Sequence, residues 1–192
     1  MIQTDFLVYQ AKSFYNAYIA LEQINTGNDN QLLYCVPIIV NGAFSIEITI
    51  KAILAKNSIE YGKEHNLYVL FKLLPEPFQN ELLDYLIRKA PEYADTKKCF
   101  DEMVLLSNAF TDWRYCFEGN PAPALESRFL AAFANAAICT MFSHYNVDFV
   151  RANSKEKTIE EVDAMIQENR EQHINENLRI INKKLGKSDV NR

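Results

Sequence analysis

The sequence predicts an all-α protein, with a bundle of about six helices followed by a C-terminal amphipathic helical arm. Apolar side chains recur every three or four residues along most of the chain, which is the spacing of one helix face. Only 5 Gly and 6 Pro interrupt the 192 residues, and no segment alternates apolar and polar residues over the length of a strand. After residue 152 the sequence becomes strongly charged. We therefore expect a helical bundle over 1–152 and a charged helical arm over 153–192.

The composition excludes several classes of protein. With 48% hydrophobic and 12% aromatic residues, the chain is too apolar to be disordered. Its formal net charge of −5 argues against strong nonspecific binding of nucleic acid, which depends on the neutralisation of phosphates by Lys and Arg. The four cysteines, each within an apolar helical pattern, are widely spaced and form no C-x-x-C pair, so we expect buried free thiols and neither a zinc site nor a redox motif. No motif implies a cofactor or a metal ion.

The N-terminus and the most apolar run predict a cytoplasmic location. Residues 1–14 carry Asp5 and lack the basic region and apolar core of a signal peptide. The run over 35–54 contains Glu47 and Lys51, which makes it a poor membrane span. We expect a soluble protein in a reducing compartment, without a membrane partner.

The first two helices are separated by a polar turn. Residues from about 5 to 24 place apolar side chains on one face, and the cluster NTGNDN over 25–30 ends that helix. The second helix covers about 31–56, with Pro37 in its first two turns, where a missing N–H is best tolerated. It is the most apolar helix of the predicted bundle.

A charged pair, Glu47 and Lys51, lies one turn apart on the second helix, beside its main apolar arc. Val40 and Phe44 continue the apolar surface beyond the pair, so we expect both charges to be half buried. One interpretation is a simple ion pair, which contributes about 0.2–0.5 kcal/mol on an exposed helix. The other is a polar network that stabilises the bundle or surrounds a site, since buried charges are costly without partners.

The later helices are separated by prolines and one glycine-containing break. We expect helices at about 65–74, 78–89, 95–118 and 124–152, with Pro75, Pro77, Pro91 and the sequence GNPAP between them. The arm carries an intermittent apolar stripe, and we expect this stripe to pack on the bundle or on another subunit. The residues of the stripe are Val162, Ile166, Leu178, Ile181 and Leu185.

Arg114 falls, by its helical angle, within the apolar stripe of the helix over 95–118. A guanidinium stays charged, so an Arg that faces a core must meet carboxylates, carbonyl groups, water or a ligand. Glu118, one turn later, and Glu47 are the candidate partners. A structural network of these three residues is one interpretation. A functional pocket is the second, and an exposed Arg is the third.

The histidines supply the remaining candidates for chemistry, because imidazoles titrate near neutrality and serve as general bases. His65 either caps the helix that it opens or joins the polar cluster. His144, with Asp148 one turn later, is either an oriented imidazole or a structural histidine at the edge of the core, and we expect His173 in solvent. The catalytic candidates are thus Arg114, His65 and His144. No glycine-rich phosphate loop, H-E-x-x-H motif or G-x-S-x-G elbow is present.

Three motifs, in this order, resemble the HEPN superfamily of small helical domains. The segment FSIEITIKAIL over 44–54 is similar to that family's E-x-x-x-K-A-L-L helix, and HNLYVL over 65–70 is similar to the H-D/N-L-x-x-L element that follows it. WRYCFE over 113–118 resembles the W-R-Y-x-x-E ending of some members. The resemblance covers about residues 5–150 and implies an HEPN-like helical bundle.

The resemblance also implies a choice between two kinds of function. The superfamily includes metal-independent ribonucleases of toxin–antitoxin, abortive-infection and antiviral systems, together with noncatalytic members. Active members carry an Arg and, after four to six intervening residues, a His near a dimer axis; the Arg steadies the scissile phosphate and the His transfers protons. Arg114 matches the Arg, but Gly119, Asn120 and Pro121 occupy the positions where the His would fall.

We therefore expect a noncatalytic binding or regulatory module in a prokaryotic defence or stress system. Its polar cluster consists of Glu47, Lys51, His65, Arg114 and Glu118. The alternative is an active ribonuclease in which His65 or His144 replaces the missing His, and a second alternative is an oligomerisation domain that uses the arm. The expected partners are a second copy of the chain and a protein encoded nearby, whereas the net charge does not favour RNA or a nucleotide.

Overall fold

The computed structural model describes residues 4–26, 33–107, 109–114, 124–145 and 159–184. Every regular element in these residues is a helix, which confirms the predicted all-α class. The chain divides into two compact units, Met1–Phe149 and Val150–Arg192, and each is described by itself. In chain order the elements are α1 (Thr4–Thr26), α2 (Cys35–Lys56), α3 (Leu67–Leu73), α4 (Glu76–Lys89), the 3-10 turn η1 (Pro91–Ala94), α5 (Thr96–Leu106), α6 (Ala109–Arg114), α7 (Ser127–His144) and α8 (Ile159–Lys184).

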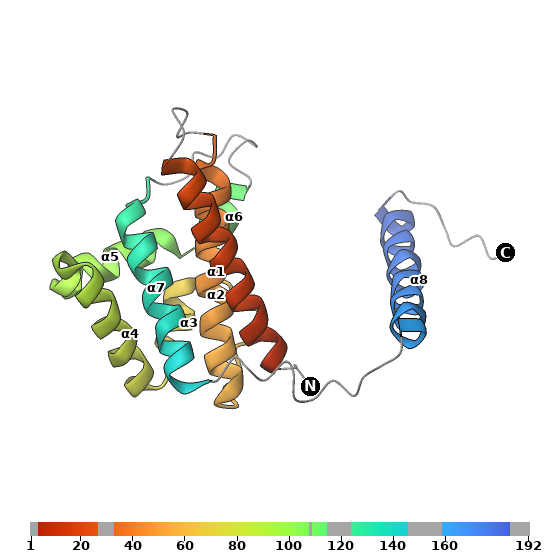
Figure 1. Ribbon diagram of the computed structural model, residues 1–192, viewed down its shortest axis with the longest axis horizontal. Helices are drawn as coiled ribbons and strands as arrows, with labels where there is room; N and C mark the ends of the chain where they lie inside the picture. The colour runs from red at the N-terminus through yellow and green to blue at the C-terminus, as the bar shows by residue number, and fades with distance from the viewer. Residues whose placement is uncertain (1–3, 27–32, 108, 115–123, 146–158, 185–192) are drawn as a thin grey trace. The chain divides into compact units, whose positions relative to one another are not determined.

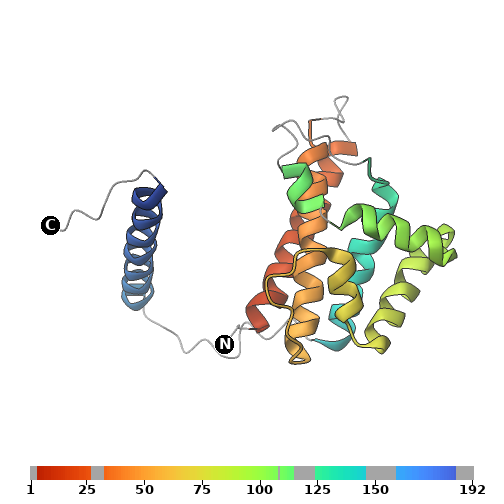
Figure 2. The same ribbon diagram turned by 180° about the vertical axis from the view of Figure 1, so that it is seen from behind.

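Helix α2 is the centre of the first unit, since it contacts α1, α3, α6 and α7 (Figures 1 and 2). Helix α4 lies on the other side of α7. An ion pair joins the start of α1 to the end of α2, because Lys56 Nζ lies 2.5 Å from Asp5 Oδ1. The first two helices therefore run antiparallel. A helix that is apolar around its whole circumference is expected in such a central position.

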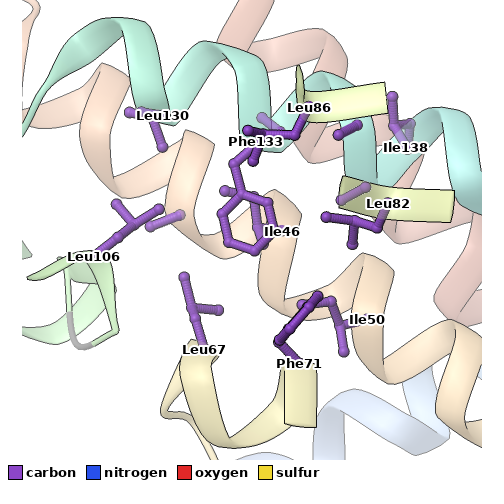
Figure 3. Packing of buried hydrophobic residues seen from close by; sticks show 14 of the residues in the cluster. Ile46, Ile50, Leu67, Phe71, Leu82, Leu86, Leu106, Leu130, Phe133 and Ile138 are labelled. Atoms are coloured by element: carbon purple, nitrogen blue, oxygen red, sulfur yellow. The ribbon is translucent and has the colours of Figure 1, made fainter. Parts of the chain in front are cut away.

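The core is formed by aliphatic and aromatic side chains that converge on α2 from several helices (Figure 3). Ile46 and Ile50 of α2 are fully buried. Phe71 of α3 and Phe133 of α7 lie beside them, and Leu82 of α4 covers the same cluster (Figure 3). Close packing of this kind makes any truncation of a core side chain costly, at about 2–5 kcal/mol for Leu or Ile to Ala.

Gly42 allows three helices to meet closely. A Cβ atom at this position would lie 3.0 Å from Leu130 Cδ1 of α7 and 3.1 Å from Tyr18 Cδ2 of α1. Tyr18 is itself buried, and its burial together with the nearby Glu22 carboxylate raises the pKa of its phenol. A glycine in the middle of a helix is about 1 kcal/mol less favourable than Ala. At position 42 the close packing of the three helices explains why a glycine is present.

The helix expected over 95–118 is divided, so that prediction is wrong in this respect: α5 ends at Leu106 and α6 begins at Ala109. The division occurs at Ser107, which is buried. Its carbonyl oxygen accepts a hydrogen bond from Leu67 N at 3.1 Å, and its hydroxyl accepts one from Tyr68 N at 3.2 Å. The same hydroxyl donates to the Met103 carbonyl at 2.9 Å. Ser107, directly after α5, therefore satisfies amides at the start of α3 while its own backbone keeps helical angles, φ −54° and ψ −36°.

The start of α3 also differs from the expectation of a helix from His65. Asn66 is its N-cap, with a side-chain oxygen that accepts a hydrogen bond from Val69 N at 3.0 Å. The Glu64 carboxylate accepts hydrogen bonds from the backbone N–H groups of His65 and Asn66, at 2.9 and 2.7 Å. These two bonds, the one from Asn66 first, lower the pKa of Glu64. The capping role therefore belongs to Asn66, not to His65.

Two other helices are shorter than expected. Leu33 and Tyr34 form a turn, so α2 begins at Cys35. Helix α7 ends at His144, since Tyr145 has the extended angles φ −128° and ψ 116°. The helix therefore does not continue directly from His144 toward residue 152, as the sequence predicted. Residues 146–158 lie outside the described part of the chain.

By its length and composition, helix α2 could also cross a membrane. Among the described residues, one helix meets these criteria, and it is α2. In this structure 78% of its most apolar stretch is buried inside the protein. A core helix of a soluble protein and a membrane span both meet these criteria, so the helix does not distinguish between the two.

Helix α8 forms the described part of the second unit. Of the stripe expected from the sequence, Leu178 and Ile181 are described, whereas the side chains of Val162, Ile166 and Leu185 lie outside what the structure describes. Ile174, Leu178 and Ile181 are each about half exposed and lie three or four residues apart. The stripe has no partner within the described residues of its own unit, which consist of this helix alone.

Candidate functional site

Glu47 and Lys51 are more deeply buried than expected. Their side chains are 2% and 9% exposed, so the prediction of half-buried charges is wrong. Lys51 Nζ donates a hydrogen bond to Glu47 Oε1 at 2.8 Å, and it lies 5.5 Å from the centre of the Tyr61 ring. Tyr61 belongs to the loop that returns over the end of α2, which explains the additional burial. Pairing compensates a part of the cost of removing both charges from water.

His65 joins this pair from the loop before α3. Its Nδ1 lies 2.9 Å from Glu47 Oε1, while its side chain is 60% exposed. Of the two roles expected for His65, membership of the polar cluster is therefore the one observed. Glu47 Oε1 thus has two nitrogen partners, one buried and one at the surface.

This geometry fixes what the cluster can do chemically. If Nδ1 carries the proton directed at Glu47, then Nε2 of His65 has a free lone pair that points away from the carboxylate. A buried carboxylate that orients an exposed imidazole is one half of a general acid–base site. The second carboxylate oxygen, Glu47 Oε2, is buried and has no hydrogen-bond partner within the described part of the chain. The charges of Glu47 and Lys51 therefore balance each other, but one oxygen of the carboxylate lacks a hydrogen bond.

Arg114 and Glu118 were expected to complete this cluster, and that expectation stays a prediction. Arg114 ends α6, but its side chain and the whole of Glu118 lie outside what the structure describes. The course of α6 along α2 is clear from its other residues. Phe110 stacks on Phe44 with ring centres 4.5 Å apart, and Trp113 shares a hollow with Ile38 near the start of α2. The backbone of α6 therefore runs away from the level of Glu47.

His144 forms a second contact between an imidazole and a carboxylate, with a partner that the sequence did not indicate. Its Nε2 lies 2.6 Å from Glu81 Oε2 of α4, and Ser143 Oγ donates to Glu81 Oε1 at 2.5 Å. Asp148, the partner expected from the sequence, lies outside the described residues. The His144 ring also packs on Phe78, with ring centres 4.6 Å apart.

The environment of Glu81 favours its charged form. Burial by itself would raise the pKa of Glu81, but the hydrogen bonds from Ser143 and His144 outweigh it and hold the pKa below its ordinary value. His144 and Glu81 are 44% and 27% exposed, so this pair lies at the edge of the bundle. His65 and His144 thus contact different carboxylates on different helices and do not form one site with each other.

The described residues contain no group of three or more His, Cys, Asp or Glu side chains that could hold a metal ion. The cysteines in this part of the chain, Cys35, Cys99 and Cys139, are free thiols. Cys99 is buried, as expected, and its burial raises the pKa of its thiol to about 11. Cys35 and Cys139 are partly exposed, so the prediction of burial is wrong for these two thiols. Cys116 lies outside the described residues.

Comparison with known proteins identifies no relative of this chain. Searches against protein-family models, curated proteins and solved structures found no match to the chain.

Proposed function

We propose that this protein is a noncatalytic binding and regulatory module of the HEPN type, which acts in the cytoplasm of a prokaryote as a homodimer in a defence or stress system. The observation that carries this proposal is the internal neutralisation of the polar cluster. Lys51 is 9% exposed and donates to Glu47, so its charge is not available to a phosphate group. Of the three described members of the cluster, only His65 reaches solvent.

Supporting evidence for a structural role comes from the position of the cluster. Glu47 lies in the central helix of the bundle and connects it, through His65, to the loop that begins α3. A cluster of this kind fixes the relative position of two helices, whereas recognition is left to the surfaces that they support. In this proposal the partner is a protein that is encoded nearby and binds the assembled bundle.

A second candidate is a metal-independent ribonuclease in which His65 replaces the missing histidine. One specific observation favours it: the His65 Nδ1 contact with Glu47 leaves Nε2 free at the surface, as a general base requires. His144 is a weaker candidate because the nitrogen that contacts Glu81 is Nε2 and the ring packs on Phe78.

The two candidates are separated by incubation of the full-length protein with labelled RNA in EDTA. The amide of His65→Asn can occupy the place of Nδ1 but supplies no equivalent of Nε2, so it preserves the cluster and removes the base. His144→Gln is the matched control at the other pair, and Arg114→Ala tests the residue that would steady the phosphate. We expect no cleavage by any of the four proteins. Cleavage that disappears in His65→Asn or Arg114→Ala, and persists in His144→Gln, would overturn the noncatalytic proposal.

A further inference from the structure

A second hollow, away from the polar cluster, lies between the end of α1, the first turns of α2, the end of α6 and the start of α7. It has a volume of about 380 Å³, which is at the small end of the range for ligand pockets. Its walls include the apolar side chains of Ile38 and Leu130. Polar side chains also line it, namely those of Glu22, Asn25, Trp113 and Ser127. An apolar cavity with a few convergent polar groups is the usual form of a small-molecule site.

Two of these polar groups are buried without a partner. Asn25 Oδ1 and Trp113 Nε1 have no hydrogen-bond partner within the described part of the chain. One is an acceptor from α1 and the other is a donor from α6. An unsatisfied buried donor or acceptor costs about 1–3 kcal/mol, so two of them lining one hollow need a physical reason. A ligand that offers both an N–H group and an acceptor atom would satisfy them together.

The charge of the hollow limits the ligand further. Glu22 contributes a carboxylate, and none of the described residues that line the hollow is Lys, Arg or His. An anion such as a phosphate or carboxylate would therefore meet the Glu22 carboxylate without a cationic side chain among the described lining residues. A neutral or cationic molecule would not have this penalty, and a cation would gain from Glu22.

We propose that this hollow binds a small neutral or cationic molecule of the amide or amidine type, with an apolar body between Ile38 and Leu130. Its N–H group donates to Asn25 Oδ1, and an acceptor atom or a π-face receives the Trp113 N–H. Water is the competing occupant, and the volume, more than tenfold that of one water molecule in the liquid at about 30 Å³, leaves room for a ligand with a ring-sized body. This inference does not depend on whether the protein cleaves RNA.

The test uses benzamide, benzamidine and benzoate, which share one shape and differ in charge. Trp113 is the single tryptophan of the chain, so its fluorescence reports on this hollow directly. We expect benzamide and benzamidine to shift the Trp113 emission of the full-length protein saturably, with Kd in the millimolar range of small fragments, roughly 1 mM. Benzoate should produce no saturable shift. Equal responses to all three probes, or no response up to about 10 mM, would overturn the proposal.

Two further measurements locate the binding. Asn25→Leu removes the acceptor and should weaken benzamide binding about tenfold, whereas Asn80→Leu, at an exposed position on α4, should leave it unchanged. In the unaltered protein, benzamide should slow alkylation of Cys35, which lines the hollow, and not of Cys139 on α7. Equal binding by the two Asn variants contradicts the proposed site, as does equal protection of the two cysteines. The alkylation measurement remains decisive if Asn25→Leu does not fold.

Discussion

The two pairs of histidine and carboxylate in the bundle have the same hydrogen-bond chemistry and different surroundings. Glu47 is buried, shares one oxygen between Lys51 and His65, and lies in the central helix. Glu81 is partly exposed and divides its oxygens between Ser143 and His144. In the first pair a cation inside the protein balances the carboxylate, and in the second pair solvent screens it. We therefore expect burial, rather than the presence of a histidine, to decide how much each pair contributes to stability.

The largest expected effect is that of Glu47→Gln, which leaves the Lys51 ammonium buried without a counter-charge. We expect a loss of about 3–5 kcal/mol in the free energy of unfolding, measured with urea near pH 7. Glu81→Gln is the matched control at the edge of the bundle and should cost less than about 1 kcal/mol. Equal losses in the free energy of unfolding for the two variants would mean that burial does not make the Glu47 pair contribute more to stability than the Glu81 pair.

The next largest effect is a recovery of stability when both members of the buried ion pair are replaced. Replacement of both charges, in Glu47→Leu with Lys51→Met, removes the pair without leaving either charge alone. We expect this double variant to regain most of the stability lost in Glu47→Gln, since a buried ion pair is often replaceable by apolar side chains of similar volume. A double variant as unstable as Glu47→Gln would assign to the ion pair a stabilising role of its own. The same urea titration measures the outcome.

The histidines should show a smaller difference in the same direction. His65→Ala removes one of two donors to the buried Glu47, and we expect a loss of about 1.5–3 kcal/mol. His144→Ala removes a donor from the partly exposed Glu81, where water replaces it, and should cost about 0.5–1.5 kcal/mol, largely through lost packing on Phe78. Thermal unfolding followed by circular dichroism gives both values.

Isosteric variants provide the controls for this measurement. His65→Asn keeps an N–H near the position of Nδ1, and His144→Gln keeps one near the position of Nε2. Each should restore a part of the stability lost in the corresponding Ala variant. If His65→Asn is as unstable as His65→Ala, the hydrogen bond to Glu47 is not the source of the effect.

The smallest expected effect is a pH dependence at Glu81. Its pKa in the folded protein is lowered from 4.5, so its hydrogen bonds stabilise the fold above pH 4.5 and lose this contribution as the pH falls through the folded pKa. The difference in stability between the natural protein and Glu81→Gln should therefore shrink below pH 4.5. Glu64 titrates in the same direction in both proteins, so it cancels in the difference. A difference that stays constant from pH 6 to the acid limit of folding would contradict the assignment.

Much of the helical organisation could be predicted from the sequence, because it depends on local periodicity. The pairing of Glu47 with Lys51 follows from a spacing of four residues on a helix. Their depth of burial does not, since it depends on the path of the loop that brings Tyr61 and His65 back over α2. Long-range placement of this kind has no signature in a short window of sequence.

Two further differences from the sequence predictions have similar causes. Glu81 precedes His144 by 63 positions and is one of several charged residues on an amphipathic helix, so no signal in the sequence distinguishes it. At the division between α5 and α6, Ser107 has its hydrogen-bond partners in the first turn of α3, which is distant in the sequence. The positions of Arg114 and Glu118 relative to Glu47 stay predictions from the sequence.

The hydrogen bonds at Ser107 have a consequence for local opening of the fold. Helix α3 contains seven residues and is too short to be stable by itself. Its first amides depend on Ser107 at the end of α5, where Leu67 N and Tyr68 N find their acceptors. The end of α5 cannot unfold without exposing these amides to water. In hydrogen exchange, α3 and the last turn of α5 should therefore open as one cooperative unit, with a common free energy of opening, although Tyr68 and Ser107 lie 39 positions apart in the chain.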